Sequence, residues 1–385
     1  MHPGGAEKAL IGMLGAIDYS KYQVDLFLNR HEGELLADIP GEVNLLPENP
    51  RFSSLAEPIK VTIKRGQFDI VLGRLLAKGL TRLKTGKNRT DAGISGDYSH
   101  RFTRIFMPKI QRNIEYDLAI SFMAPHYFIA QKVNAKTKIA WIHTDYSQIS
   151  INRISQKKMW SQFDHIIAVS KGVADTFDQV FPELADKVVV VENILPVEQI
   201  RKQALQKVDD FPLDGTIRLL SVGRFSYPKN FDNVPFICRQ LLDKGLPIKW
   251  YIIGYGSEEK KIRDSIKEAH VDNEVIILGK KRNPYPYIRQ CDLYVQPSRY
   301  EGKAITVREA QTLMKPVVIT NYPTAVSQVR NGLDGIIVPL DTNNCADGIA
   351  AVLNNRPLMD ELSHQCSLFD YSARSEIEKI YRMME

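Results

Sequence analysis

The sequence predicts an α/β protein with two doubly wound parallel sheets, one in each half of the chain. Short apolar runs typical of buried strands alternate with helical patterns almost throughout the 385 residues. Strands that alternate with helices require parallel sheets covered by helices on both faces. The chain is also too long for one ordinary hydrophobic core, which favours two domains.

In the first half, the expected helices are residues 6–17, 70–84 and 172–180. The expected strands are residues 24–28, 43–46, 118–122, 138–142, 166–169 and 188–191. Only Met1, His2 and Pro3 precede Gly4-Gly5, although a first βαβ unit needs a strand before its glycine-rich turn. Either the sequence starts late or the first sheet lacks a central strand, and we expect exposed strand edges beside the gap.

In the second half, the expected helices are 232–244, 258–269 and 306–314. The expected strands are 217–222, 249–253, 275–278, 293–296, 317–320 and 335–338. Residues 194–215 are polar and contain Pro196 and Pro212, as is typical of a linker. We therefore expect a first domain over 1–193, a second over 216–370, and a terminal helix in 371–385.

Bulk composition is that of a soluble globular protein, with 44% hydrophobic and 25% charged residues. The four cysteines are scattered without the spacing of a disulfide scaffold or a metal site, which favours a reducing cytoplasm. No apolar run is long enough to span a membrane, and no signal peptide is recognisable.

The net charge of +6 is unevenly distributed, because residues 60–112 hold thirteen Lys and Arg against three Asp. Within this stretch, residues 70–84 have basic side chains at four-residue intervals beside Leu and Ile, which indicates an amphipathic basic helix. Such a helix either lies on an anionic membrane or packs on the sheet with a solvated face. Nucleic acid is a poorer partner, since no aromatic stacking platform accompanies the charge.

The most informative stretch runs from Ser298 to Ala310 and holds two glutamates eight positions apart. Glu301 follows a strand closed by Pro297, and Glu309 lies about one turn into the next helix. Ligands of open α/β sheets gather at the carboxyl ends of the strands. The amides between the glutamates approach a helix N-terminus, which favours an anion. They belong to Gly302, Lys303, Ala304, Ile305 and Thr306.

A second motif follows the strand 217–222 and opens a helix near Asn230. Gly223 allows a tight turn there, and Arg224 and Lys229 place two cations at the same kind of strand-to-helix crevice. Two cations beside an amide-rich helix start suit a diphosphate, and a nearby carboxylate suits sugar or ribose hydroxyls. Neither motif is specific alone, but their order and their strand-end positions together form a strong signal.

Together, the two motifs resemble the donor site of the retaining glycosyltransferases of family 4, which have the two-domain GT-B fold. The resemblance spans nearly the whole chain and includes residues 252–257, 278–288, Trp141-Ile-His-Thr-Asp145 and Gly4-Gly-Ala-Glu-Lys8. The residues around Lys303 resemble the branch that builds bacterial capsular and other surface polysaccharides. The resemblance implies two Rossmann-like domains facing each other across a cleft, with the terminal helix crossing back to the first domain.

The resemblance also implies roles for the matched residues. Glu309 accepts hydrogen bonds from the ribose hydroxyls, and Glu301 contacts the donor sugar near the reacting carbon. Arg224 and Lys229 neutralise the departing diphosphate in place of a divalent metal, so that no metal and no cofactor are expected. The expected catalytic residues are thus Glu301, His143, Arg224 and Lys229. The other expected binding residues are Gly223, Gly254, Lys280, Asn283, Gly4, Gly5 and the 302–306 run, with Lys303 as a third cation.

The implied activity is retaining transfer of a hexose from a nucleotide diphosphate sugar to a glycan or lipid-linked acceptor, with UDP favoured as the nucleotide and GDP left open. The expected location is the cytoplasm, peripherally at the inner face of the membrane. A GT-B epimerase or sugar-nucleotide hydrolase and a non-catalytic GT-B scaffold subunit remain open as alternatives. A dehydrogenase is disfavoured, because Gly254 and Gly256 are followed by Glu259 where a dinucleotide fingerprint has a third glycine.

Overall fold

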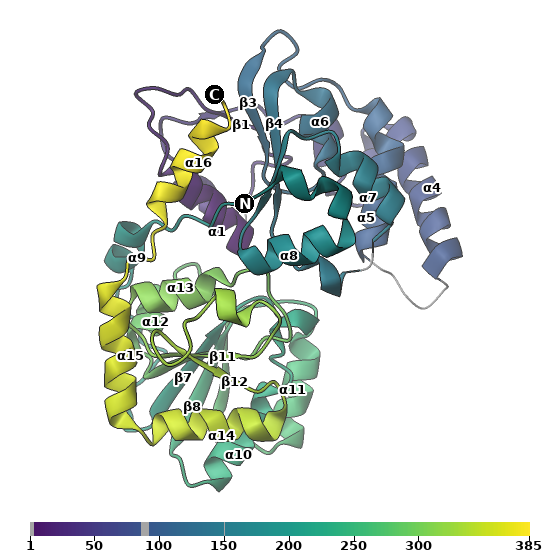
Figure 1. Cartoon of the computed structure of the whole chain (residues 1–385). Coiled ribbons are helices and arrows are strands. Elements are labelled where there is room, and N and C mark those ends of the chain that lie inside the picture. Colours follow the sequence, from purple (N-terminus) through teal and green to yellow (C-terminus); the bar gives the residue numbers. More distant parts are fainter. Residues whose placement is uncertain (1–3, 86–91, 150) are drawn as a thin grey trace. The chain divides into compact units, whose positions relative to one another are not determined.

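The computed structural model describes residues 4–85, 92–149 and 151–385 and confirms the α/β prediction. The described residues form two compact units (Figure 1). Unit 1 contains Met13–Glu192 and Ser375–Glu385, and unit 2 contains residues 4–12 and Asn193–Arg374. Each unit holds a parallel sheet with its own helices.

Unit 2 is built on a six-stranded parallel sheet in the order β12-β11-β10-β7-β8-β9. Strands β7 and β10 are neighbours at the middle of the sheet. The strand that follows β7 in sequence pairs on one side of this central pair, and the strand that follows β10 pairs on the other side. The strands are β7 (Ile217–Val222), β8 (Ile248–Ile253), β9 (Val275–Gly279), β10 (Leu293–Gln296), β11 (Val317–Thr320) and β12 (Ile336–Val338). All six strands lie within one or two residues of the ranges expected from the sequence.

Alternate side chains of these strands enter two separate hydrophobic cores, because successive residues of a strand point to opposite faces. Leu219, Trp250 and Val295 pack in one core with α10 (Val234–Asp243), α11 (Glu259–Glu268) and α14 (Thr342–Leu353). Leu220, Tyr251 and Tyr294 pack in the other with α9 (Val197–Gln203), α12 (Tyr285–Gln290) and α13 (Ile305–Thr312). Helix α15 (Arg356–Leu368) also belongs to this unit. Helices thus cover both faces of the sheet.

Unit 1 contains a four-stranded parallel sheet in the order β3-β4-β5-β6 and a separate parallel pair, β1 and β2. The strands are β1 (Asp25–Leu26), β2 (Asn44–Leu45), β3 (Tyr116–Ser121), β4 (Ala135–Ile142), β5 (His165–Ala168) and β6 (Val188–Val190). No strand among the described residues joins this pair to the four-stranded sheet. The separation of β1 and β2 from the four-stranded sheet is consistent with the alternative that the first sheet lacks a central strand.

Helices surround the sheet of unit 1, and α4 lies at the outside of the unit against α5 (Figure 1). The helices are α2 (Pro50–Ser53), α3 (Ile59–Lys64), α4 (Phe68–Thr85), α5 (Ala92–Thr103), α6 (Tyr127–Lys132), α7 (Arg153–Trp160) and α8 (Lys171–Val180). No helix in the described ranges is long and apolar enough to cross a membrane.

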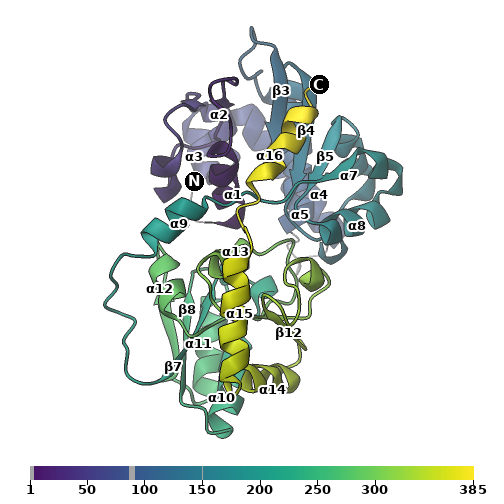
Figure 2. The ribbon, with the colours of Figure 1, turned by 60° about the vertical axis from the view of Figure 1, so that its left-hand side comes forward.

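Two short segments differ from the expected domain arrangement, and a third, the terminal helix, agrees with it. Helix α1 (Gly5–Leu14) begins in unit 2, because residues 4–12 pack with that unit and not with the first domain as expected. The expected linker 194–215 belongs to unit 2 and contains α9. Helix α16 (Ile377–Arg382) belongs to unit 1, where the Tyr381 hydroxyl accepts a hydrogen bond from the Asp18 amide at 2.9 Å. Figure 2 shows α15 and α16 as separate helices at the yellow end of the chain.

Unit 1 also contains three histidines in apolar surroundings. Burial lowers the pKa of His126 to about 3, with further lowering by the charges of His143 and His100. Burial likewise lowers the pKa of His100 and of His143 to about 4. The His126 ring lies 4.7 Å from the Trp160 ring, and its Nδ1 is 2.9 Å from the Ser121 hydroxyl. These histidines are therefore neutral in the folded protein at pH 7.

We predict that unit 1 loses stability as the pH falls from about 6.5 toward 4. The unfolded chain binds protons on these histidines below about pH 6.5, whereas the folded chain does not, so the stabilisation is complete only above that pH. At pH 5 each histidine should lower the free energy of unfolding by roughly 2 kcal/mol relative to pH 7. Denaturant titrations at both pH values, followed by tryptophan fluorescence, measure this difference. His126→Gln should reduce the difference, whereas the exposed control His364→Gln should leave it unchanged.

Candidate active site

The two sequence motifs follow neighbouring strands of unit 2. The loop carrying Arg224 and Lys229 leaves the carboxyl end of β7, and the loop carrying Glu301 leaves the carboxyl end of β10. These strands are adjacent, yet their next strands lie on opposite sides. Open α/β sheets bind ligands at such a point, where the loops after two neighbouring strands lead to opposite sides of the sheet. The structure therefore brings both motifs to one place.

Glu301 and Lys229 form an ion pair between these loops. The Lys229 ammonium lies 2.5 Å from Glu301 Oε1, which also accepts a hydrogen bond from the Ser298 hydroxyl at 2.7 Å. Both side chains are largely buried. Thr324 donates to the Glu301 carbonyl at 2.8 Å and so holds the loop backbone. The sequence analysis gave these two residues separate roles, whereas the structure shows them in contact.

The packing around Gly223 and Gly254 favours glycine at both positions. A Cβ at this position would lie 3.2 Å from the Lys229 side chain and 3.3 Å from the Phe231 ring, so glycine leaves room for the aliphatic part of Lys229. Gly254 has a related reason, because a Cβ there would lie 1.9 Å from the Gly223 carbonyl oxygen. Gly254 therefore permits the ends of β7 and β8 to approach closely, and the tight turn at Gly223 stays a prediction.

A second ion pair joins the same two loops. Arg299 donates to both carboxylate oxygens of Asp232, at 3.0 and 2.9 Å, and its guanidinium lies 4.3 Å from the centre of the Tyr227 ring. The Arg299 amide donates to the Pro228 carbonyl at 2.7 Å. Burial raises the pKa of Asp232, but hydrogen bonds from Arg299 and Lys261 outweigh it and the pKa is lowered. This contact holds the residues next to Lys229 and Glu301 in register, and the sequence analysis did not identify it.

Glu309 is the most deeply buried charged residue of the site, with only 1% of its surface exposed. It lies in α13, in which every residue except Thr306 is buried. Glu309 Oε1 accepts hydrogen bonds from the Lys8 ammonium at 2.7 Å and from the Tyr285 hydroxyl at 3.0 Å. Glu309 Oε2 is buried and has no hydrogen-bond partner in the described structure. One carboxylate oxygen is therefore held by the protein and the other is left as an acceptor.

The amides expected to bind an anion are only partly available. The Ala304 amide donates to the Gln328 side chain at 2.6 Å, so it is already used. Ile305 and Thr306 form the first turn of α13, where N–H groups lack intrahelical acceptors. Gly302 is buried and Lys303 is half-buried in the loop that precedes the helix. Anion binding by this run stays a prediction.

The other predicted residues of unit 2 lie around this edge. Arg224 is exposed and forms no ion pair within the described ranges. Lys280 follows β9 with its ammonium 5.3 Å from the centre of the Tyr255 ring. The Asn283 amide group donates to the Gln203 carbonyl at 2.9 Å and to the Gln206 side chain at 2.8 Å, so this side chain ties α12 to α9. Recognition of a base at 280–283 stays a prediction, and it depends on backbone groups.

His143 belongs to unit 1 and follows β4. Its Nε2 donates to the Phe122 carbonyl at 2.8 Å, and its ring lies 4.7 Å from the Phe122 ring. The depressed pKa leaves the imidazole neutral at pH 7. Its contact with a donor sugar stays a prediction.

Gly4 and Gly5 were assigned to the first domain, but both pack with unit 2. Gly5 opens α1, and a Cβ at this position would meet nothing within 4 Å, so the space beside it is open. Lys8, one turn further along, contacts Glu309 and was not selected from the sequence. Its only signal was its place in the Gly4-to-Lys8 motif, because 301 positions separate it from Glu309.

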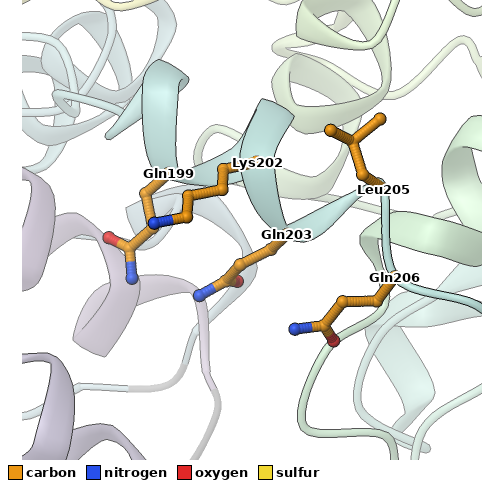
Figure 3. Close-up of a pocket in the computed structure, with 5 residues that line it drawn as sticks. All are labelled: Gln199, Lys202, Gln203, Leu205 and Gln206. Carbon is orange, nitrogen blue, oxygen red and sulfur yellow. The ribbon is translucent and has the colours of Figure 1, made fainter.

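A pocket of about 460 Å³ lies elsewhere in unit 2, along α9 (Figure 3). Its lining consists of Gln199, Lys202, Gln203, Leu205 and Gln206. None of the predicted site residues lines it.

Comparisons with known proteins agree with the resemblance seen in the motifs. Residues 205–368 match the family of glycosyl transferases group 1. A Campylobacter jejuni enzyme named N-acetylgalactosamine-N,N'-diacetylbacillosaminyl-diphospho-undecaprenol 4-alpha-N-acetylgalactosaminyltransferase is 24% identical over 260 residues. The match covers 63% of this chain and 68% of that protein. The amylovoran biosynthesis glycosyltransferase AmsD of Erwinia amylovora is 28% identical over 156 residues, covering 40% of this chain and 43% of AmsD.

Solved structures show the same fold at low sequence identity. HepE of Anabaena, crystallised with UDP, matches with a TM-score of 0.63 and 15% identity, covering 99% of this chain and 96% of HepE. TarM of S. aureus, crystallised with UDP among other ligands, matches with a TM-score of 0.56 and 19% identity. That match covers 70% of this chain and 55% of TarM, so this chain spans about half of TarM. The predicted fold, with two Rossmann-like domains of the GT-B type, is confirmed.

Proposed function

From the match of residues 205–368 to the glycosyl transferases group 1, we propose that this protein is a retaining glycosyltransferase. It moves a hexose from a nucleotide diphosphate sugar, with UDP as the nucleotide, to a glycan or lipid-linked acceptor in surface polysaccharide synthesis. The names of the Campylobacter and Erwinia relatives support this acceptor class, and the UDP bound to HepE and TarM supports the nucleotide.

The observation that carries the proposal is the buried carboxylate of Glu309, on the helix α13 that follows β10. Its Oε2 is an acceptor without a donor, which a ribose hydroxyl would satisfy. Two cations, Arg224 and Lys229, lie in the adjacent loop. A hydroxyl-bearing nucleoside with a diphosphate needs an acceptor and cations at one edge, and this edge holds both.

In the proposed mechanism Arg224 and Lys229 stabilise the negative charge that develops on the departing diphosphate. Positioned charge stabilisation is commonly the largest catalytic contribution, and losing one such contact costs roughly 2–4 kcal/mol in the activation barrier. Lys229 has three N–H donors and uses one on Glu301, so two remain for phosphate oxygens. Lys303 is the third proposed cation, and the N-terminus of α13 also favours an anion.

Glu301 acts on the sugar side in this proposal. Its Oε1 is held by Lys229 and Ser298, which fixes the orientation of the carboxylate. There it orients the sugar and stabilises positive charge on the anomeric carbon as the leaving group departs. His143, neutral at pH 7, is the remaining proposed catalytic residue.

Glu309→Ala should weaken UDP binding by about 10- to 100-fold, because hydrogen bonds to charged groups contribute about 1.5–3 kcal/mol. Glu301→Ala should instead slow transfer while changing UDP binding little, since the proposal assigns it to the donor sugar and not to the nucleotide. Calorimetric titration of UDP and initial transfer rates with a UDP-sugar panel separate the two effects. Glu259→Ala on the exposed face of α11 is the matched control. Equal affinities and rates in the parent and both site variants would contradict the donor-site assignment.

Product analysis in the same assay separates the proposed transfer from other activities of this fold. Transfer requires an acceptor and yields a glycosylated product. Free sugar formed without acceptor would identify a hydrolase, and an altered sugar nucleotide would identify an epimerase. A folded protein that binds UDP and forms no product with any acceptor tested would favour a scaffold subunit.

We further propose that the reaction does not require a divalent metal, because Arg224 and Lys229 supply positive charge at the diphosphate. Transfer should therefore continue at an unchanged rate in excess EDTA. The measurement is the initial rate before and after chelation. A loss of activity that magnesium or manganese restores would overturn metal independence without affecting the donor-site assignment.

The proposed membrane partner rests on one face of α4. Five large apolar side chains on this helix are exposed: Phe68 by 66%, Leu72 by 56%, Leu75 by 51%, Leu76 by 49% and Leu83 by 83%. Their spacing places them on one side of the helix. Lys78 and Arg82 are also exposed and border this face. An apolar stripe beside cations suits an anionic membrane surface, where a lipid-linked acceptor lies.

Arg74 does not belong to this surface, contrary to the sequence pattern. Its guanidinium donates to the Ser54 carbonyl at 2.7 Å and to the Thr62 hydroxyl at 3.2 Å, and burial lowers its pKa. Residues 86–91, which complete the basic stretch with Lys87 and Arg89, lie outside the described residues. The proposed contact is therefore made by the exposed face of α4, with Lys60 and Lys64 nearby in sequence and exposed.

The protein should co-sediment with liposomes that contain anionic lipid, and the bound fraction should fall as salt rises. Each Lys or Arg near such a surface contributes about 1 kcal/mol. Lys78→Glu with Arg82→Glu should therefore reduce binding strongly, as should Leu72→Ser with Leu75→Ser. Lys260→Glu with Lys267→Glu changes the charge similarly in unit 2 and should have little effect. Salt-independent binding, or no binding, would contradict the membrane assignment.

A further inference from the structure

The two oxygens of the Glu309 carboxylate have different surroundings. Oε1 accepts two hydrogen bonds, from the Lys8 ammonium at 2.7 Å and from the Tyr285 hydroxyl at 3.0 Å. Oε2 is buried and has no hydrogen-bond partner in the described structure. Buried polar atoms are nearly always paired in native proteins, so an unpaired acceptor beside a ligand crevice indicates a ligand donor. The protein has placed its own donors on one oxygen only.

The position of Lys8 is set by the packing of α1 within unit 2. Lys8 and Gly12 are four residues apart and therefore lie on the same face of the helix. A Cβ at Gly12 would lie 1.9 Å from the Ile194 carbonyl oxygen, so only glycine allows α1 to approach that backbone. The same approach brings the Lys8 ammonium to Glu309 and places it 4.7 Å from the centre of the Tyr285 ring.

We propose that Lys8 and Tyr285 are positioning residues of the nucleotide site, which hold Glu309 Oε1 and thereby direct Oε2 toward a ribose hydroxyl. This inference rests on the proposed function, in which the crevice binds a nucleoside diphosphate sugar. A buried carboxylate needs a countercharge, and Lys8 is the cation in contact with Glu309 among the described residues. Without Lys8 the carboxylate would rotate toward another donor, and Oε2 would lose its direction.

The consequence is a role in specificity for a residue that touches no substrate. A site built to hydrogen-bond a hydroxyl rejects an analogue that lacks it, because the buried acceptor is then left unpaired. That rejection depends on a carboxylate held in one orientation. Lys8 and Tyr285 should therefore control the preference for ribonucleotides over deoxyribonucleotides more than they control binding of the diphosphate.

The test compares UDP with its 2′-deoxy and 3′-deoxy analogues by calorimetric titration of the full chain. The parent protein should bind at least one deoxy analogue about tenfold more weakly than UDP, a difference of about 1.4 kcal/mol. In Lys8→Met this ratio should fall to about twofold or less. Lys8→Arg keeps the charge and should retain most of the ratio. Lys260→Met removes an exposed lysine of α11 and should change nothing.

Tyr285→Phe provides an independent variant, because it removes one of the two hydrogen bonds to Oε1 and keeps the ring. The ratio of deoxy-analogue Kd to UDP Kd in Tyr285→Phe should lie between the ratios of the parent and of Lys8→Met. If Lys8→Met does not fold, a lowered ratio in Tyr285→Phe supports the inference and an unchanged ratio contradicts it. In a Glu309→Gln background, Lys8→Met should cause no further change in the ratio. A parent ratio that persists in both Lys8→Met and Tyr285→Phe overturns the inference, as does a parent that does not distinguish the analogues. A parent that binds neither UDP nor GDP overturns the proposed function instead.

Discussion

A negative charge buried in α13 constrains much of the structure around it. Glu309 lies almost completely out of water, and a buried carboxylate is tolerated only when it is paired and hydrogen-bonded. Lys8 of α1 supplies the countercharge and Tyr285 of α12 supplies a second donor. Two helices far apart in sequence are thus held at one point of a third. The packing of the N-terminal residues on unit 2 follows from this requirement.

Arg308, the residue before Glu309, connects α13 to the backbone of two other segments of unit 2. Arg308 is buried and donates to the Asn193 carbonyl at 2.9 Å and to the Tyr371 carbonyl. These carbonyls lie near the start and near the end of the 193–374 part of unit 2, and the Leu195 amide donates to the Ser372 carbonyl at 2.9 Å. Helix α13 therefore carries a site carboxylate and anchors both of these segments.

The crevice between β7 and β10 is pre-organised by ion pairs between its two loops. Arg299 with Asp232 fixes the loop backbones, and Lys229 with Glu301 keeps a cation and a carboxylate in position. Groups that are already oriented need no reorganisation when charge develops during a reaction. Unit 1 has neutral buried histidines beside aromatic rings where unit 2 has ion pairs. It also has an apolar face on α4 that no part of the described chain covers.

The sequence alone determined the strands, the two-unit α/β class and the positions of both motifs at strand ends, because these depend on local periodicity and on turn residues. It also singled out Glu301, Glu309, Arg224 and Lys229. Only the tertiary structure decided which groups meet. Lys8 reaches Glu309 across 301 positions, Arg74 turns inward to Ser54 and Thr62, and Leu75 and Leu76 turn outward. Periodicity defines the faces of a helix but not what packs against each face, and pairing between distant segments depends on packing that no local pattern records.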